Sequence, residues 1–258
     1  MTVALIYHDI APQAQQDQCG FPGPIAARYK LEPERFAEHL DAIAATGVSV
    51  GQVGDGSRAA LTFDDGGASA LDAAEALERR GWRGHFFITT GRIGTSGFLS
   101  AAQVRELADR GHRVGSHSVS HPTYMGELSA AELADEWRSS RAALAEILGG
   151  EPDSAAVPGG FLSAAVIDEA AKAGYGLLAT SQPTVKPDTH RGMRVQGRFT
   201  IWNATVPSRA AAYARGDRLA LMSLWLAWQA KSAPKRVSPK AYETLRRRWA
   251  RSPRSARG

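Results

Sequence analysis

Two groups of polar side chains in this chain have the types and spacing needed to bind and use a metal ion. Asp64 and Asp65 stand side by side in a Thr-Phe-Asp-Asp-Gly segment, and His117 and His121 stand in a His-Ser-Val-Ser-His segment. A catalytic zinc-type ion is held by about three protein ligands, which leaves a position for water. We expect Asp65, His117 and His121 to be the ligands. A carboxylate that does not bind the ion can take a proton from the water, so we predict that Asp64 is the general base.

Each group also has a simpler interpretation. Two acidic residues before a glycine can form a polar turn that caps a helix beginning near Ala68. Two histidines in a loop can be ordinary surface residues. The surrounding sequence favours the metal site, because both groups directly follow strand-like runs, at 59–63 and 112–116. In α/β proteins the functional loops leave the carboxyl ends of strands, so the two groups are expected at the same end of the fold.

The elements that must position these residues follow a βαβα order. Strand-like runs alternate with amphipathic helices that stop at glycine. Capping boxes mark helix starts at Ser100 with Gln103 and at Ser129 with Glu132, and Pro33 suits the first turn of another helix. The order predicts parallel strands in either a closed barrel or an open doubly wound sheet. The predicted strands are 3–7, 59–63, 85–88, 113–116, 155–158, 175–180 and 194–200.

Length and composition narrow the class of protein. A chain of 258 residues can bury one sizeable core, so we expect one catalytic domain and a tail. The single Cys19 excludes an internal disulfide and a cluster of cysteine ligands. The first residues lack the pattern of a secretory signal, and we therefore expect a cytoplasmic protein. The longest apolar run, 219–230, is interrupted and too short to span a bilayer.

The two groups, in this order, resemble the signature of the polysaccharide deacetylases with the NodB homology domain, a carbohydrate esterase family 4-like group. The resemblance covers roughly residues 1–205, and three further segments agree with it: Leu5–His8, Gly84–Ile88 and Gly111–His117. It implies an α/β fold with a distorted TIM-like (β/α)7 barrel as a single catalytic domain over 1–205. It also implies a divalent metal cofactor, with zinc as the default, and an acetylated saccharide as substrate.

The third motif of the family departs from its commonest form. Many members carry an Arg before a proline pair, and that Arg orients the catalytic base. Here the equivalent segment has Pro158, Gly159 and Gly160 and no Arg, which resembles a Pro-Gly-Gly variant. The glycines could let a backbone N–H approach the substrate and stabilise an oxyanion. A plain strand-to-helix turn is an equally acceptable interpretation.

The last motif departs further, because the Leu-x-His whose imidazole protonates the leaving amine is missing. His190 is the only histidine in that stretch, and we expect it to be a solvated loop residue. His8 is our candidate replacement, since it closes the first strand, and Asp9 could orient its imidazole or bind substrate. A structural role for His8 is about as plausible. Arg198 directly precedes Phe199 in the last predicted strand. We expect Arg198 to form a surface ion pair rather than contact substrate.

The C-terminal extension, 206–258, is expected to be helical and holds the excess positive charge. Residues 231–258 contain ten Lys or Arg and one acidic residue, a net of +9, so the rest of the chain carries −4 of the formal +5. We expect a solvated helix over 239–250 and an arginine-rich end. The alternative is peripheral contact with an anionic membrane, at its inner face, aided by apolar residues. No nucleic-acid partner is expected, because no motif with interleaved aromatics is present. The apolar residues that would aid membrane contact are Leu224, Trp225, Leu226 and Trp228.

These observations predict a metal-dependent hydrolase that removes acetyl groups, N-acetyl rather than O-acetyl, from a saccharide or glycan precursor. The cytoplasmic expectation favours a nucleotide-linked or lipid-linked precursor as the substrate. Two alternatives stay open. One is an amide hydrolase that acts on a non-sugar substrate, and the other is a saccharide-binding pseudoenzyme. The presence of Asp64 argues against the pseudoenzyme, because a base that is not a ligand has no role in mere binding.

Overall fold

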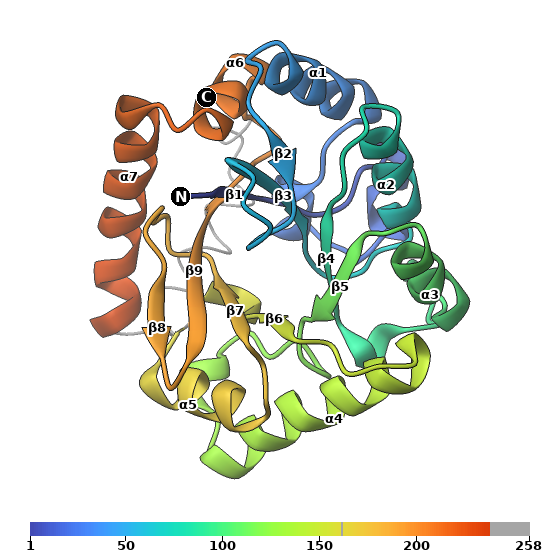
Figure 1. Cartoon of the computed structure of the whole chain (residues 1–258), viewed down its shortest axis with the longest axis vertical. Coiled ribbons are helices and arrows are strands. Elements are labelled where there is room, and N and C mark those ends of the chain that lie inside the picture. The colour runs from blue at the N-terminus through green and yellow to red at the C-terminus, as the bar shows by residue number, and fades with distance from the viewer. Residues whose placement is uncertain (161, 238–258) are drawn as a thin grey trace.

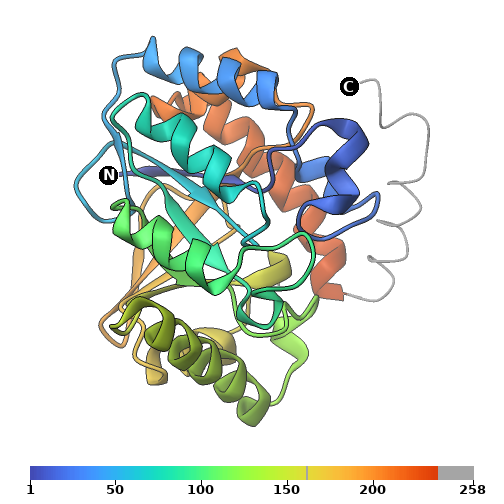
Figure 2. The same ribbon diagram turned by 90° about the vertical axis from the view of Figure 1, so that its right-hand side faces the viewer.

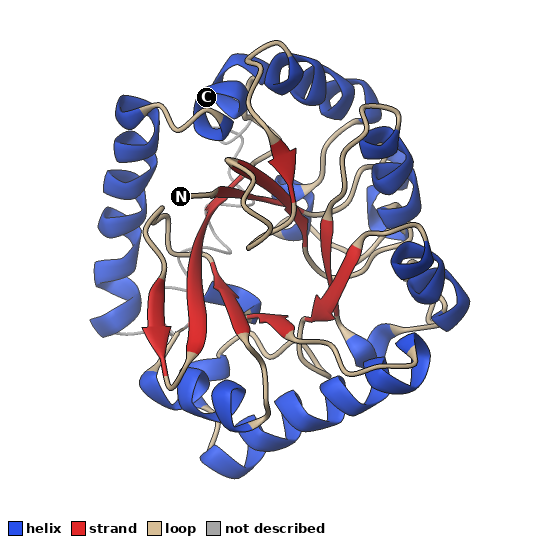
Figure 3. Ribbon diagram, in the orientation of Figure 1, coloured by secondary structure: helices blue, strands red, loops and turns tan. Residues whose placement is uncertain are grey.

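Seven parallel strands form a closed ring at the centre of the molecule, and the helices lie outside it (Figures 1 and 3). The computed structural model describes residues 1–160 and 162–237. The strands run in the order β1-β3-β4-β5-β6-β7-β9, and parallel pairing of β1 with β9 closes the ring. Their bounds are β1 Val3–Tyr7, β3 Ala59–Phe63, β4 His85–Ile88, β5 Arg113–Ser116, β6 Ser154–Ala156, β7 Leu177–Thr180 and β9 Met193–Thr200.

The closed ring confirms the barrel and excludes the open sheet. The ring is distorted, because β5 and β6 share a single paired position, Ser116 with Ala155. Strands β1 and β3 are buried at every residue. This explains why their sequences are continuous apolar runs rather than alternating ones. Tyr7 pairs with Phe63, so the residues that follow these two strands leave the barrel side by side.

The helices begin and end largely where local signals predict. Both capping boxes form, at Ser100 and at Ser129, and Gly149 ends the helix that follows Ser129 in a left-handed conformation. The helices are α1 Pro33–Ala44, α2 Ala70–Glu78, α3 Ala101–Asp109, α4 Ala130–Leu148, α5 Ala164–Lys172, α6 Pro207–Ala214 and α7 Arg218–Val237. The 3-10 helices are η1 Gln13–Gln18, η2 Ala26–Tyr29, η3 Thr90–Arg92, η4 Met125–Glu127 and η5 Pro158–Gly160.

Two short strands were not predicted. Strand β2, Val50–Gly51, pairs in parallel with β3. Strand β8, Asp188–His190, forms an antiparallel hairpin with β9, within the segment that we expected to be a polar loop. Both are too short to produce a hydrophobic period, and β8 is mostly exposed. The predicted helix over 239–250 and Phe161 lie outside the described residues.

The loop after β1 and the C-terminal end of α7 lie toward the same end of the barrel (Figure 2). This is the end at which the parallel strands finish. No helix in the part of the chain described here is both long and apolar enough to cross a membrane.

Candidate active site

The two acidic residues leave β3 in a strained turn. The backbone N–H of Asp64 donates to the carbonyl of Tyr7, 3.0 Å away, which continues the pairing of β3 with β1 by one residue. Asp65 then takes a left-handed conformation, with φ of +78°. Among the described residues only four that are not glycine have positive φ, and Asp65, Ser118 and His121 are three of them. Such strain gathers where function demands a particular side-chain direction.

The capping interpretation of this turn is wrong. The residue before α2 is Ser69, and no side chain caps that helix. Asp64 and Asp65 are instead buried, and both carboxylates lie close to His117.

Asp65, His117 and His121 converge on one point. The Oδ1 atom of Asp65 lies 3.4 Å from Nε2 of His117 and 3.4 Å from Nε2 of His121. One ligand atom from each of the three lies within 4.8 Å of the others. Two ligands of a tetrahedral zinc ion, bound at about 2.1 Å, are about 3.4 Å apart. The donor types and their spacing therefore fit a zinc-type ion.

Hydrogen bonds fix the direction of the histidines. Nδ1 of His117 lies 3.0 Å from the carbonyl of Ala156 on β6, so Nδ1–H donates there and the lone pair of Nε2 faces Asp65. The backbone N–H of His121 donates to Oγ of Ser118, 3.1 Å away, which holds the short loop between the two histidines. The Phe21 ring covers His121, with the ring centres 4.7 Å apart.

The charges of this cluster are unbalanced without a cation. Burial raises the pKa of Asp65 to about 7, and the charges of Asp64 and Asp9 add to the rise while His8 opposes it. Oδ1 of Asp65 is buried and has no hydrogen-bond partner. Burial also lowers the pKa of His117 to about 3, so its imidazole is neutral at neutral pH. Neutral imidazoles around an unsatisfied carboxylate oxygen are the chemistry of a metal site.

Arg198 is buried and forms a two-hydrogen-bond ion pair with Asp64, so our expectation of a surface ion pair was wrong. Its side chain is 1% exposed and reaches across the barrel interior from β9. Nη1 donates to Oδ1 of Asp64 at 2.6 Å and Nη2 donates to Oδ2 at 2.9 Å. Nη1 also donates to the hydroxyl of Thr62, 2.9 Å away. The contact that the resemblance assigns to a third-motif Arg is thus made here by an Arg from a different strand.

This ion pair sets the charge of Asp64. Burial by itself would raise the pKa of the carboxyl group, but the guanidinium of Arg198 and the nearby His117 outweigh burial and hold the pKa at about 2. Asp64 is therefore ionised at neutral pH. Its neighbour Asp65, with a pKa of about 7, is only partly ionised there.

His8 lies beside the carboxylates but lacks the expected partner. Its ring packs on Tyr29, with ring centres 4.7 Å apart, and its Nδ1 is buried without a hydrogen bond. Asp9 does not orient the imidazole. Its Oδ1 instead accepts a hydrogen bond from Oγ of Ser69 at 3.1 Å, and its Oδ2 lies 4.0 Å from Nζ of the buried Lys30. Asp9 thereby ties the loop after β1 to the start of α2.

The Pro-Gly-Gly segment forms η5 next to the loop that carries His121. Gly159 has φ of +63° and Gly160 has φ of +72°. A Cβ on Gly159 would lie 2.6 Å from the carbonyl oxygen of Thr123, so only glycine fits this approach. Pro158 is buried beneath the turn. The segment lies close to the three candidate metal ligands, because Ala156, two residues before Pro158, accepts the hydrogen bond from His117.

The other histidines lie elsewhere. His190, on β8, hydrogen-bonds to Asp168 at 2.6 Å and its side chain is 38% exposed. His39, His85 and His112 are buried and contact partners outside this cluster, so their roles are structural.

Comparison with known proteins supports the family. The sequence model described as "Polysaccharide deacetylase" matches residues 51–178, a range that holds both histidines of the cluster and both acidic residues but not His8 or Arg198. The peptidoglycan-N-acetylglucosamine deacetylase PgdA of Listeria monocytogenes is 30% identical over 114 residues, which is 43% of this chain and 23% of PgdA. The chain therefore spans about a quarter of the length of this curated relative.

Solved structures share the fold. A polysaccharide deacetylase from Bacillus cereus superposes with a TM-score of 0.69 at 20% identity, over 83% of this chain and 68% of that one. The deacetylase PplD of Streptococcus pyogenes, solved in complex with acetate, gives 0.67 at 19% identity, and IcaB of Ammonifex degensii gives 0.65 at 22%. Each of these two matches covers 83% of this chain and 97% of the other. These structures show that the fold is shared, and the matched sequence model shows that residues 51–178 belong to the polysaccharide deacetylase family.

Proposed function

We propose that this protein is a metal-dependent hydrolase that removes N-acetyl groups from a saccharide or glycan precursor. The observation that carries the proposal is the buried Asp64–Arg198 pair next to three converging metal-type ligands. The name of the Listeria relative describes a deacetylase of N-acetylglucosamine, and this favours N-acetyl over O-acetyl groups.

Asp65, His117 and His121 would hold a divalent ion, with zinc as the default. When bound, such an ion supplies Lewis acidity, which makes water more acidic and an acetyl carbonyl more electrophilic. The hydrogen bond from His117 to the carbonyl of Ala156 keeps the Nε2 lone pair of His117 directed toward Asp65 and His121. Iron, cobalt and nickel accept the same donors, so the metal present depends also on availability.

Asp64 takes the proton of the attacking water. Each oxygen of its carboxylate accepts one hydrogen bond from Arg198, and each oxygen keeps a second lone pair that can receive the proton. Arg198 holds the carboxylate at a fixed orientation through two parallel hydrogen bonds. Arg198 is therefore a positioning residue, and Asp64 is the catalytic base.

The tetrahedral intermediate needs an oxyanion partner and a proton donor. We assign the oxyanion contact to backbone N–H groups at Gly159 and Gly160, where the absence of side chains allows close approach. We assign protonation of the leaving amine to His8, whose imidazole lies near enough to affect the pKa of both carboxyl groups. The buried, unpaired Nδ1 of His8 marks a ring that is not committed to a structural hydrogen bond at that atom.

The buried Asp64–Arg198 pair also argues against the saccharide-binding pseudoenzyme. Burying an arginine and a carboxylate is costly, and a hydrophobic pair of similar size often stabilises a protein better. A protein that only binds saccharide has no use for a buried carboxylate held by two hydrogen bonds. The non-sugar amide hydrolase stays a competitor, because the fold and the metal cradle do not select the acyl compound.

A substrate panel separates these functions. Zinc-reconstituted protein is incubated with N-acetylated oligosaccharides, O-acetylated oligosaccharides and small cyclic amides, and released acetate or opened amide is measured, with protein treated with a chelator as control. The proposal expects acetate from the N-acetylated sugars, and loss of that release after chelation. Turnover of cyclic amides alone would reject the saccharide substrate. Absence of turnover on every compound, with stoichiometric zinc and intact folding, would reject catalysis.

A further inference from the structure

Helix α7 exposes an apolar face away from the barrel. Leu219 is 75% exposed, Met222 53%, Leu226 55% and Trp225 39%. Leu219, Met222 and Leu226 are spaced by three and four residues, which places them on one side of a helix. In the part of the chain whose side chains are described, six large hydrophobic residues are exposed, and these four are among them. Among the residues whose burial is described, the large exposed apolar side chains are therefore concentrated on one helix.

The opposite side of α7 is already used. Ala220 belongs to the main hydrophobic core, and Leu221 and Leu224 pack against it. Leu224, which we had grouped with the membrane-facing residues, thus belongs to the packed side. The face formed by Leu219, Met222, Trp225 and Leu226, called here the α7 face, is free to contact something outside the barrel.

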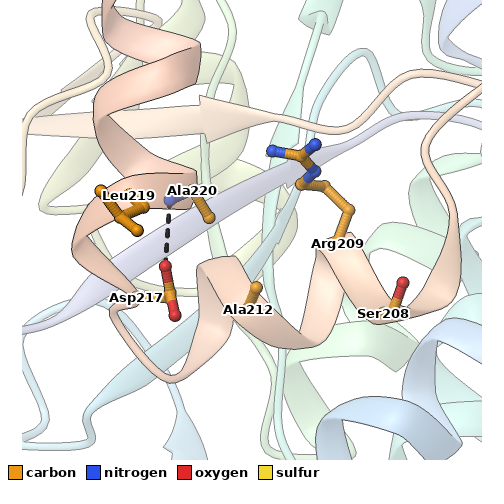
Figure 4. A pocket seen from close by; sticks show the side chains of 6 residues that line it. All are labelled: Ser208, Arg209, Ala212, Asp217, Leu219 and Ala220. Carbon is orange, nitrogen blue, oxygen red and sulfur yellow. Dashed lines mark hydrogen bonds between the residues drawn. The ribbon is translucent and has the colours of Figure 1, made fainter.

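Basic residues flank the α7 face. Arg218 lies exposed at its start, Arg215 beside it pairs with Asp217 at 3.1 Å, and Arg209 lines a shallow pocket of about 300 Å³ between α6 and α7 (Figure 4). Leu219 and Asp217 also line that pocket, so its lining is apolar with one charge of each sign, and the excess positive charge lies in Arg218 and in the sequence after α7. Beyond α7, residues 238–258 contain seven Lys or Arg and one Glu, a net of +6. An apolar helical face with a Trp, bordered by Arg and continued by a basic segment, is the pattern of a helix that binds an anionic lipid surface.

The charge also argues against a second copy of this chain as the occupant. Pairing two α7 faces would bring together two sets of flanking arginines and two basic segments of the same sign, which repel. An anionic bilayer neutralises them instead. The α7 face lies in the first half of the helix, whose start is near Val3, at the end of the barrel where the strands begin: a Cβ on Gly216 would lie 3.8 Å from Cγ2 of Val3.

We propose that the α7 face docks the protein on the surface of an anionic lipid bilayer, with Leu219, Met222, Trp225 and Leu226 entering the headgroup region. The assignment does not depend on the proposed catalytic function, because its test measures binding and not turnover.

The test is co-sedimentation of the full chain with vesicles of phosphatidylcholine that contain phosphatidylglycerol, compared with vesicles of phosphatidylcholine alone. The proposal expects binding to the anionic vesicles that falls as salt rises. The double variant Met222→Gln/Leu226→Gln keeps the net charge and should lower the partition coefficient by about tenfold or more, since two apolar side chains no longer enter the lipid. The matched control, Ala102→Gln/Ala131→Gln, changes exposed positions of α3 and α4, outside the α7 face, and should bind as the parent does.

Folding of each variant is checked by thermal denaturation, and Leu219→Gln/Met222→Gln serves as a second pair if the first does not fold. Equal vesicle binding by the parent and by a folded face variant would overturn the assignment, because the basic segment alone would then account for it. Failure of the full chain to bind anionic vesicles at low salt would also overturn it. A parent dimer in sedimentation velocity that is lost in the face variant would overturn the assignment in favour of self-association. Binding of RNA without binding of vesicles would overturn it as well.

Discussion

At the scale of single residues, the account depends on two neighbouring carboxylates that have opposite surroundings. Asp64 accepts two hydrogen bonds from Arg198, and its pKa is held at about 2. Asp65 has an oxygen without a partner, and burial raises its pKa to about 7. One carboxylate is thus prepared to be an ionised base, and the other gains most from a cation. Adjacent residues with pKa values driven apart are typical of a divided catalytic role.

Changing Arg198 to Lys should lower kcat by about 10- to 100-fold without loss of bound metal, because lysine cannot make the two parallel hydrogen bonds that hold Asp64. Changing Arg198 to Met should cost more and should also move the acid limb of the activity profile to higher pH. The reason is that burial raises the pKa of Asp64 once the guanidinium is absent. Acetate release as a function of pH, with metal content measured on the same samples, checks both. Full activity of Arg198→Met would contradict the positioning role.

Asp65→Asn should have opposite effects on the metal-free and metal-loaded protein. Removing an unpartnered buried carboxylate should raise the melting temperature of the metal-free form. Zinc should then no longer stabilise the variant, whereas zinc at a hundred times its Kd stabilises a protein that binds it by about 2.7 kcal/mol. Thermal denaturation with and without zinc measures both effects. A variant that keeps the zinc-dependent shift of the parent would show that Asp65 is not a ligand.

At the scale of elements, close backbone approach places the site residues, and partly exposed ion pairs join the surrounding helices. Strand β5 delivers His117, and its Gly115 packs so tightly that a Cβ there would lie 2.6 Å from Oγ of Ser154 and 2.8 Å from its carbonyl oxygen. Helices α2 and α3 are joined by Glu78, which accepts hydrogen bonds from Arg110 at 2.8 and 3.0 Å and lies 2.8 Å from Nε2 of His112.

Gly115→Ala should therefore destabilise the protein by about 1–3 kcal/mol, the usual cost of overpacking, and should weaken zinc binding because β5 carries His117. Gly150→Ala is the matched control, since a Cβ there meets no atom within 4 Å. Urea denaturation and zinc titration of both variants provide the measurement. Equal stability of the two variants would show that β5 can accommodate a Cβ at position 115 without loss of stability, which would contradict the prediction.

Glu78 should make stability depend on pH in the acid range. Hydrogen bonding to Arg110, aided by His112 and opposed in part by burial, lowers the pKa of Glu78 from 4.5 to about 2. A folded-state pKa below the unfolded one gives stability that is present above pH 4.5 and is lost as the pH falls through about 2. The stability difference between the parent and Glu78→Gln should thus shrink over that window, as measured by urea denaturation at several pH values. The same trend in the control, Glu34→Gln at an exposed position of α1, would contradict the assignment.

At the scale of the whole molecule, closure of the barrel explains which parts the sequence could predict. The strands, both capping boxes and the motifs of β3 and β5 depend on local pattern, so they were predictable from periodicity and spacing. The choice of a barrel came from the family resemblance. Arg198 was missed because it pairs with a residue 134 positions away, and only the pairing of β9 with β1 brings it there. No local signal reports a contact of that range.

The most direct test of the central claim is a measurement on Asp64→Asn. The variant is loaded with zinc, its metal content and folding are verified, and acetate release from the N-acetylated sugar that the parent accepts is compared with the parent and with Asp135→Asn, a variant at an exposed position of α4. The account predicts one zinc per chain in all three proteins, parent-like release by Asp135→Asn, and a fall of about 100-fold or more in kcat for Asp64→Asn, since general base catalysis contributes that much. Parent-like turnover by zinc-loaded Asp64→Asn would show that Asp64 is not the base and that the buried pair with Arg198 serves only the fold.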